Sequence, residues 1–250
     1  MYRLKQSLGQ HFLKDENICK KIVAALQQHP FHQLLEVGPG GGALTKYLLQ
    51  IPNINFKTAE VDDEKVDFLV KTYPPLKEMI IHRDFLTIEK PFENKFTIVG
   101  NFPYNISSQI LFKILEWKVD VECVIRMFQK EVAQRIKAKE GNKTYGVLSV
   151  LMQAFFEVQY LFEVSQGSFQ PPPKVKSAVI RLLPVKNNLP LRSEKEFFLL
   201  VKTAFNQRRK ILRNAVKNLF DAAILEDELF NKRPEQLSVQ DFATLTFKMK

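Results

Sequence analysis

The chain has 250 residues, of which 45% are hydrophobic and 26% charged, the balance of an ordinary soluble globular protein with a substantial core. Lys and Arg outnumber Asp and Glu by 37 to 27, and the resulting net charge of +10 favours a polyanionic partner, either nucleic acid or an anionic membrane. No run of about 18 uncharged apolar residues is present, and the N-terminus "MYRLKQSLGQHFL" lacks the apolar stretch of a signal peptide, so we expect no membrane span and no leader.

Cysteine and histidine are sparse. Cys19 and Cys123 lie far apart and form no metal-type pair, which favours a reduced cytoplasmic protein with inert thiols. His29 and His32 are close in sequence but have no Cys or further His beside them. We therefore expect no metal site.

Short apolar runs alternate with helical patterns along the first part of the chain. The runs typical of strands cover residues 32–38, 55–61, 78–84, 95–101 and 121–128. Between them, apolar residues recur at helical spacing in 42–50, 64–73 and 107–117. This alternation predicts an α/β domain with a parallel sheet covered on both faces. Ligands of such sheets bind at the carboxyl ends of the strands.

The last part of the chain has a different pattern. A proline-rich loop and another apolar run, expected to be a last strand, fill residues 166–185, and 186–193 are typical of a linker. From Glu194 onward the apolar spacing is helical. We therefore expect one domain over 1–185 and a small helical domain over 186–250. The second holds 13 Lys and Arg against 8 Asp and Glu, half of the chain's excess charge.

A glycine-rich loop, "LLEVGPGGGALTKYL" (34–48), lies between the first predicted strand and the first predicted helix. Gly38 and Gly40 let the backbone approach a ligand closely, with the start of the helix directed at it. The spacing Gly38-x-Gly40-x-x-Ala43 also fits a dinucleotide fingerprint, so the loop alone does not distinguish NAD from S-adenosylmethionine.

Charge distinguishes the two cofactors. Glu36, Glu60 and Asp84 stand at or near the ends of the first three predicted strands. A pyrophosphate would be repelled by Glu36, whereas the ammonium and sulfonium of S-adenosylmethionine would be attracted. Glu60 can accept both ribose hydroxyls, and Asp84 can accept from the adenine amino group. The sequence therefore favours S-adenosylmethionine. Asp62, Asp63 and Glu64, in contrast, are typical of a helix start.

The fourth predicted strand ends in the cluster Asn101-Phe102-Pro103-Tyr104. It predicts a turn, and also a pocket for a flat ligand that carries an amino group. The side-chain carbonyl of Asn101 and the main-chain carbonyl of Phe102 or Pro103 can accept the two hydrogens of an adenine amine and direct its lone pair at a methyl group. Tyr104 can stack on the base, which must be unstacked or flipped to enter.

The cluster "NFPY" resembles the N-[L/I/F]-P-Y motif of amino-methyltransferases that act on adenine. The chain as a whole resembles the ribosomal RNA adenine dimethyltransferase family, specifically its small-subunit, kasugamycin-sensitivity branch. Four further matches in the family's order are "LGQHFL" (8–13), "EVGPGGG" (36–42), "FQPPPKVKS" (169–177) and "FNQRRK" (205–210). The resemblance implies a Rossmann-like class I S-adenosylmethionine-dependent methyltransferase domain followed by a small C-terminal all-helical domain.

The same resemblance assigns roles to individual residues. It makes His11 and Leu13 cofactor contacts, together with Gly38, Glu60, Asp84 and Asn101. Many family members have Asn where this chain has His11, and an imidazole can still donate a hydrogen bond. Phe169 would stack on the base face opposite Tyr104; without the resemblance, it would be a loop aromatic packed on the core.

Basic residues gather in "FNQRRKILRNAVKNLF" (205–220), for which we predict one helix. Arg209, Arg213 and Lys217 would share a face of it, beside Arg208 and Lys210. Such a stripe would give salt-dependent RNA binding, and Lys174 would extend it. The alternative is an ordinary solvated helix face.

The function implied is transfer of two methyl groups to N6 of each of two adjacent adenines near the 3′ end of small-subunit ribosomal RNA. The substrate would be an assembling small ribosomal subunit, and the enzyme a monomer. Three alternatives stay open. They are a large-subunit adenine methyltransferase of the macrolide-resistance type, a non-catalytic RNA-binding assembly or transcription factor, and a DNA adenine methyltransferase.

Overall fold

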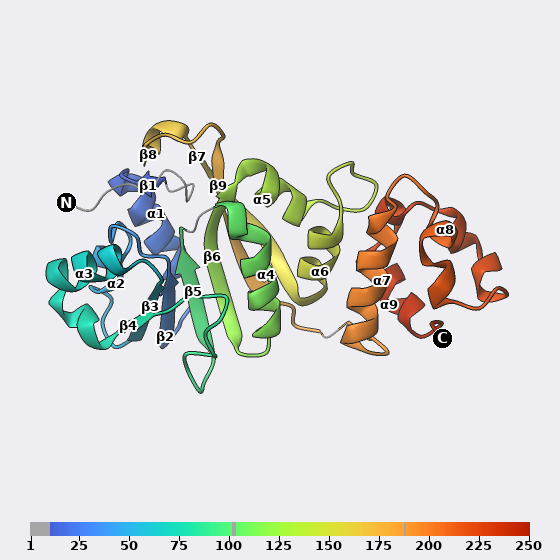
Figure 1. The fold of residues 1–250 in the computed structure, drawn as a ribbon, viewed down its shortest axis with the longest axis horizontal. Coiled ribbons are helices and arrows are strands. Elements are labelled where there is room, and N and C mark those ends of the chain that lie inside the picture. The colour runs from blue at the N-terminus through green and yellow to red at the C-terminus, as the bar shows by residue number, and fades with distance from the viewer. Residues whose placement is uncertain (1–10, 102–103, 188) are drawn as a thin grey trace. The chain divides into compact units, whose positions relative to one another are not determined.

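The structure is a computed structural model that describes residues 11–101, 104–187 and 189–250 (Figure 1). The described residues up to Ala133 and those of Gln159–Pro184 form one compact unit. A second unit combines Gln134–Val158 with Val185–Lys250. These units differ from the expected division after residue 185 in one respect, since 134–158 is grouped with the C-terminal helices.

A seven-stranded sheet forms the centre of the first unit, in the order β4-β3-β2-β5-β6-β9-β7. Its strands, in chain order, are β2 Gln33–Val37, β3 Asn55–Glu60, β4 Ile80–His82, β5 Phe96–Gly100, β6 Val121–Gln129, β7 Phe156–Val164 and β9 Ser177–Pro184. The five strands predicted from the sequence are confirmed, and neighbours among β2 to β6 pair in parallel.

The sequence predicted a parallel sheet, but the sheet is mixed, because β6 and β9 pair antiparallel. The chain returns to β9 from β7 through the 3-10 turn Gln166–Ser168 and the short strand β8, Phe169–Gln170. A parallel return would usually need an α-helix that crosses one face of the sheet. The connection from β7 to β9 contains no α-helix, so the return strand runs in the opposite direction.

Helices cover both faces of the sheet. Apolar residues of α1 (Glu16–Leu26), α2 (Thr45–Leu48) and α3 (Asp63–Thr72) share one core with Leu34, Val99 and Ile125. Side chains alternate along a strand, so Leu35, Ile98 and Val124 point to the opposite face. There α4 (Ser107–Glu116) buries its own apolar stripe, Ile110, Leu111, Ile114 and Leu115.

Side-chain hydrogen bonds fix both ends of α1. At its start, Asp15 accepts from the main-chain N–H groups of Asn17 and Ile18, as an N-cap does. At its end, the buried Arg181 of β9 donates to the carbonyl of Ala25 (2.9 Å) and to Gln28 Oε1 (2.5 Å). Arg181 thus ties the antiparallel strand to the last turn of α1.

A separate two-stranded sheet fixes the first described residues. Strand β1, Phe12–Leu13, pairs antiparallel with β8, so that Phe12 faces Gln170 and Leu13 faces Phe169. The N–H of Lys14 also donates to the carbonyl of Ser168 at 2.9 Å.

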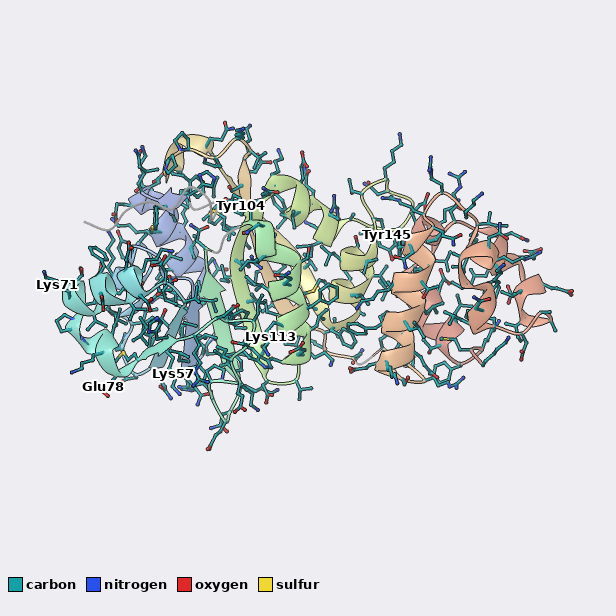
Figure 2. All side chains as sticks on the ribbon, viewed as in Figure 1. Lys57, Lys71, Glu78, Tyr104, Lys113 and Tyr145 are labelled. Atoms are coloured by element: carbon teal, nitrogen blue, oxygen red, sulfur yellow. The ribbon has the colours of Figure 1, made fainter. Side chains whose placement is uncertain are left out.

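The second unit is helical apart from the first residues of β7. Its helices α6 (Val147–Phe155), α7 (Glu194–Asn206), α8 (Leu212–Val216) and α9 (Val239–Thr246) pack on one another, which explains why 134–158 belongs here. Tyr145 is fully buried beside α7, with its ring 6.1 Å from that of Phe205 (Figure 2). The remaining elements of the chain are α5 Lys130–Lys137 and the 3-10 turns Pro74–Glu78, Tyr104–Ile106, Lys217–Leu219, Ile224–Glu226, Glu228–Asn231 and Pro234–Gln236.

The predicted single helix over 205–220 is wrong. Helix α7 ends at Asn206, residues 207–211 form a turn, and α8 begins at Leu212. The N–H of Leu212 donates to the carbonyl of Lys232 at 2.8 Å, a tertiary bond that takes it out of the helical ladder. Arg209 therefore does not share a helical face with Arg213 and Lys217. Within the described ranges, no helix is long and apolar enough to cross a lipid bilayer.

Candidate active site

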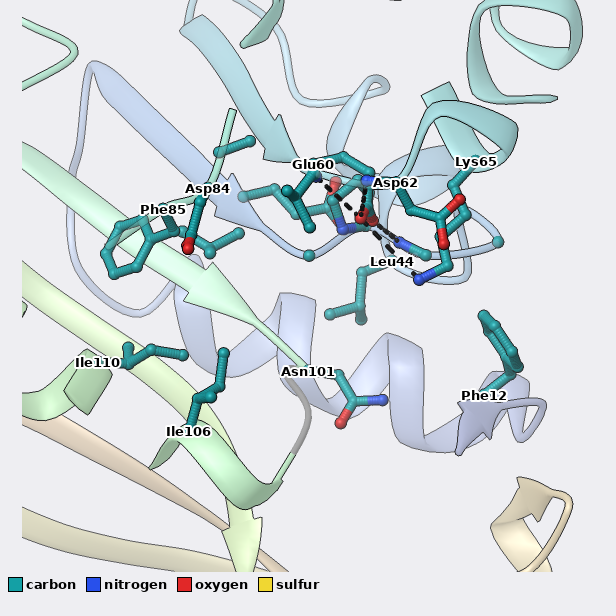
Figure 3. A pocket seen from close by; sticks show the side chains of 18 of the residues that line it. Phe12, Leu44, Glu60, Asp62, Lys65, Asp84, Phe85, Asn101, Ile106 and Ile110 are labelled. Carbon is teal, nitrogen blue, oxygen red and sulfur yellow. Dashed lines mark hydrogen bonds and ion pairs between the residues drawn. The ribbon is translucent and has the colours of Figure 1, made fainter. Parts of the chain in front are cut away.

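A cavity of about 530 Å³ opens at the carboxyl ends of β2, β3 and β5 (Figure 3). This is the edge at which a parallel sheet binds its ligands. The cavity brings together nine residues that the sequence singled out: His11, Leu13, Glu36, Gly38, Gly40, Glu60, Asp84, Asn101 and Tyr104. Phe102 and Pro103 lie outside the described residues.

Glu36 is the most deeply placed acid of the cavity. It sits on β2, one residue before the strand ends, and is 1% exposed. Its Oε2 accepts a hydrogen bond of 2.7 Å from the hydroxyl of Thr45 at the start of α2. Burial raises the pKa of Glu36 to about 8, against the lowering effect of the Thr45 hydroxyl.

Glu60 ends β3 and is held by main-chain donors. Its Oε1 accepts from the N–H groups of Val61 (3.0 Å) and Asp62 (3.2 Å), and its Oε2 from the N–H of Gly40 (3.3 Å). The ammonium of Lys65 lies 3.9 Å from Oε1. Figure 3 shows this carboxylate beside the glycine loop. It therefore links the ends of two neighbouring strands across the cavity wall.

Asp84 follows β4 by two residues, on an exposed part of the wall, as Figure 3 shows beside Phe85. One of its oxygens, Oδ1, accepts from the N–H of Leu86 at 2.9 Å. Its main-chain carbonyl accepts from Thr87 and Ile88, which fixes the turn that presents the carboxylate.

The glycine loop has the backbone that its sequence requires. Gly38 and Gly40 have φ of +61° and +56°, which side chains other than glycine rarely adopt. A Cβ at Gly40 would lie 3.1 Å from the ring of Phe12. Helix α2 is shorter than predicted, since only Thr45–Leu48 is helical.

Asn101 directly follows β5, and its side chain lines the cavity (Figure 3). Tyr104 begins the 3-10 turn that leads into α4, and its hydroxyl forms a hydrogen bond of 2.5 Å with Ser177 Oγ of β9. Burial raises the pKa of the Tyr104 phenol. The ring of His11 lies 6.3 Å from that of Tyr104, and His11 Nδ1 donates to the carbonyl of Pro171 at 2.9 Å.

Phe169 is the one described residue of the predicted catalytic set that the structure does not bring to the cavity. Its side chain is 1% exposed and belongs to the hydrophobic core that also contains Leu13 and Ile18. In this conformation Phe169 is not available to stack on a base. The β1–β8 pairing is the cause, since it places Phe169 opposite Leu13 with both side chains buried.

Two basic residues of the cavity were missed from the sequence. Lys65 is buried within α3, near Glu60, and its ammonium lies 5.9 Å from the centre of the Phe12 ring. Arg83 lines the wall beside Asp84. Lys65 lies in an acidic run typical of a helix start, and only its burial reveals it. In the described part of the chain, no three His, Cys, Asp or Glu side chains gather as a metal ion would require.

The predicted RNA-binding residues are distributed over both units. Lys174 is exposed in the loop before β9, in the first unit. In the second unit, Arg209, Lys210 and Lys217 are exposed. Arg208 and Arg213 are half-buried, and the Arg208 guanidinium donates to the main-chain carbonyl of Lys143.

Comparison with known proteins agrees with this geometry. A family model described as "Ribosomal RNA adenine dimethylase" matches residues 1–246. The chain is 53% identical to "Ribosomal RNA small subunit methyltransferase A" of Flavobacterium johnsoniae over 99% of this chain and 96% of the relative. It is 51% identical to the protein of the same name from Cytophaga hutchinsonii, over 98% and 96%.

Two solved structures are similar over nearly their whole length. A dimethyladenosine transferase from Plasmodium falciparum superposes with a TM-score of 0.79 at 27% identity, covering 94% of this chain and 96% of that one. The 23S rRNA methyltransferase ErmE gives 0.69 at 25% identity, covering 93% and 99%.

The mixed sheet, the helices on both faces and these neighbours define a class I methyltransferase with a Rossmann-like fold, a class that uses S-adenosylmethionine. Within that class, the chain belongs to the ribosomal RNA adenine dimethylase family.

Proposed function

We propose that this protein transfers methyl groups from S-adenosylmethionine to N6 of two adjacent adenines near the 3′ end of small-subunit ribosomal RNA. The observation that carries the proposal is the meeting of Asn101 with the acidic strand ends Glu36, Glu60 and Asp84 in one cavity. Relatives that are half identical over nearly the full chain bear the name of a small-subunit methyltransferase, which supports this choice of substrate.

The residues of the cavity fit the proposed cofactor. Glu36 and Glu60 place carboxyl oxygens where an ammonium and ribose hydroxyls need acceptors, and Asp84 can accept from an amino group. Gly38 and Gly40 line the cavity with positive φ angles, so the loop presents backbone without side chains to a ligand. S-adenosylmethionine supplies a methyl group on a positively charged sulfur, which is an activated electrophile.

Asn101 would act on the acceptor base. Its side-chain carbonyl accepts a hydrogen from the exocyclic amine, which makes the nitrogen more tetrahedral and aims its lone pair into the cavity. Tyr104, fixed through Ser177, offers a ring on which a flipped adenine can stack. No strong base is required, because the methylated aminium loses its proton readily. Catalysis would thus depend on positioning and electrostatics.

A basic surface of the second unit would bind the RNA backbone. The contact of Arg208 with Lys143 brings the turn 207–211 together with the exposed loop residues 139–144. Arg209 and Lys210 on the first, and Lys139 and Lys143 on the second, can neutralise phosphates. Arg213 and Lys217 of the neighbouring elements, and Lys174 of the first unit, would add further contacts. We further propose that the enzyme acts as a cytoplasmic monomer on an assembling small subunit.

The test of the function is methyl transfer from labelled S-adenosylmethionine to undermethylated small subunits, large-subunit RNA and duplex DNA. N6,N6-dimethyladenosine on the small subunit alone is expected, identified by mass spectrometry. Label on large-subunit RNA or on DNA would replace the proposed substrate. Cofactor binding without any transfer would favour a non-catalytic RNA-binding factor.

Asn101→Ala tests the acceptor role. We expect kcat to fall by about 100-fold or more, as when a positioning group for the reacting atom is removed. Cofactor affinity should fall less than kcat, because Glu36, Glu60 and Asp84 still contact the cofactor when the contact of Asn101 is lost. Equal activity in the variant would contradict the assignment.

The RNA surface is tested by salt dependence. Arg209→Gln should lower the slope of log affinity for small subunits against log salt by about one. Lys195→Gln, an exposed charge near the start of α7, is the matched control and should leave the slope unchanged. Equal effects of the two substitutions would show that RNA binding depends on the net charge of the protein and not on a defined surface around Arg209.

A further inference from the structure

Arg126 is a buried cation close to the acceptor side of the active site. It lies in the middle of β6 and is 1% exposed, although arginine is almost never fully buried without specific partners. Because side chains alternate along β6, Arg126 points to the sheet face that α4 covers, together with Val124 and Phe128. Its guanidinium lies 4.3 Å from the centre of the Phe128 ring.

The guanidinium holds the first residue of α4. Nη1 donates to the main-chain carbonyl of Ser107 at 3.3 Å, and Nη2 donates to Ser107 Oγ at 3.2 Å. Ser107 is itself buried. Two hydrogen bonds from one planar group to one residue fix the position and the direction of the helix start.

The main chain of Arg126 holds the opposite end of the same segment. In the parallel pairing of β5 with β6, Arg126 is the partner of Gly100, the last residue of β5. Gly100 immediately precedes Asn101, and Ser107 immediately follows the turn that begins at Tyr104. A single residue therefore contacts both ends of the segment that carries Asn101 and Tyr104.

We propose that Arg126 is a positioning residue for methyl transfer. It fixes Gly100, which precedes Asn101, and Ser107, which follows the turn that begins at Tyr104, and so sets the distance between the acceptor amine and the cofactor side of the cavity. This inference rests on the proposed function of Asn101. Tyr104 supplies a third attachment through its hydrogen bond to Ser177, which is on β9, the other neighbour of β6.

Burial of this charge is otherwise hard to explain. Desolvation lowers the pKa of Arg126 well below its ordinary range, so keeping a guanidinium here costs free energy. An apolar residue of similar size would fill the same place between Phe128 and α4 at lower cost. The arginine gains what an apolar residue lacks, namely directed bonds to Ser107.

The test compares Arg126→Met with Arg181→Met. Arg181 is the matched control, because it is also a buried arginine of the same sheet. Its bonds go instead to Ala25, Gln28 and His29 at the end of α1 and to Gln159 of β7. Denaturant melts establish that each variant is folded before its kcat is compared. For Arg126→Met, kcat per molecule of bound cofactor should fall about 10- to 100-fold, because small misplacement of a reacting group has effects of that size. The cofactor Kd should change less than about twofold.

Arg181→Met should keep the wild-type kcat per molecule of bound cofactor. Equal loss of kcat in the two variants, or unchanged kcat in Arg126→Met, would overturn the proposal. Arg126→Lys, which retains charge but not the two-pronged geometry, should recover only part of the rate. In a double-mutant cycle, Ser107→Ala should add little further loss to Arg126→Met.

A second readout does not depend on methyl transfer. Hydrogen exchange of a peptide containing residues 104–111 should become faster in Arg126→Met and stay unchanged in Arg181→Met. If wild-type protein methylates no RNA, the proposed function fails while this measurement still decides whether Arg126 fixes the segment. Unchanged exchange in Arg126→Met would refute that role.

Discussion

The hydroxyl of Thr45 donates a hydrogen bond of 2.7 Å to Glu36 Oε2, and both side chains are buried. This is the one hydrogen bond to the Glu36 carboxyl that the structure records within residues 11–101, 104–187 and 189–250. A buried carboxyl with a single neutral donor favours its protonated form, and the pKa of Glu36 is accordingly raised from 4.5 to about 8. The acid that should attract a cationic cofactor is thus mostly uncharged in the free protein at neutral pH.

Cofactor affinity should therefore rise with pH between about 6 and 8. The negative charge that stabilises the ammonium or sulfonium forms only as Glu36 loses its proton, so binding releases a proton in this range. In Glu36→Gln, affinity above pH 8 should be lower by about 10-fold or more, the contribution of a hydrogen bond to a charged group. Calorimetric titration of both proteins across this range measures the effect. Parallel pH profiles would show that Glu36 does not titrate on binding.

The same carboxyl should make the fold less stable in alkali. The folded state binds a proton at Glu36 that the unfolded chain releases above about pH 4.5. The stabilisation of the fold by this protonated carboxyl is therefore fully present below that pH. It is lost progressively as pH rises toward and through 8. Glu36→Gln should lack this loss. Its free energy of unfolding, measured in urea at pH 9, should exceed that of wild type by roughly a few kcal/mol. A constant difference between the two proteins at pH 4 and pH 9 would contradict the raised pKa.

Thr45→Val should shift the pH midpoint of cofactor binding upward. The Thr45 hydroxyl is the hydrogen bond that lowers the pKa of Glu36, so its removal leaves burial unopposed. Thr45→Ser keeps the hydroxyl and is the control, expected to bind with the wild-type midpoint. A midpoint that stays in place in Thr45→Val would show that this hydroxyl does not set the protonation of Glu36.

Gly42→Ala should be more destabilising than Gly141→Ala. Both glycines have positive φ, +80° and +82°, so backbone strain of about 1 kcal/mol is common to both. A Cβ at Gly42 would lie 2.6 Å from Tyr73 Cε2, whereas nothing lies within 4 Å of a Cβ at Gly141. The clash should add about 1–3 kcal/mol to the loss of unfolding free energy. Denaturant melts of the two variants give the difference directly, and equal losses would show that Tyr73 moves aside freely.

Phe169→Ala distinguishes the buried position of Phe169 from the stacking role that the family resemblance implies. If Phe169 is a core residue, its truncation to Ala should lower the free energy of unfolding by about 3–5 kcal/mol. The loss for Phe169→Leu should be smaller, and KM for small subunits should stay near the wild-type value in that variant. A raised KM at unchanged stability would instead mean that Phe169 leaves the core to contact the base.

Much of this site was predictable because its polar residues come at or next to the ends of apolar runs that form strands. Glu36, Glu60 and Asn101 each come at or next to the end of an apolar run, and parallel strands bring such ends together. The helix start at Asp62 was predicted for the same local reason and is confirmed by its bond from the N–H of Glu64. Local sequence was sufficient to predict an element wherever hydrogen bonds between neighbouring residues determine its structure.

The misses have tertiary causes. The helical pattern of 205–220 continues through residues 207–211, but the carbonyl of Lys232 takes the N–H of Leu212. Phe169 matches a family motif whose stacking role stays a prediction, and its burial opposite Leu13 agrees with the alternative that it packs on the core. The sequence did not predict a role for Arg126, because an arginine in an apolar run is usually exposed. Its contacts with Ser107 and Phe128 show that it is buried and bonded.

The pairing of β1 with β8 also sets an order of events during synthesis. His11 and Leu13 form one wall of the cavity, and that wall is attached to Phe169 and Gln170. Strands β2 to β6 all precede Phe169 in the chain, so a nascent polypeptide has the material for the central parallel strands long before it has the partner of β1. A chain that stops short of Phe169 leaves this wall without its anchor. The cavity becomes complete only late in translation, when most of the first unit has already left the ribosome.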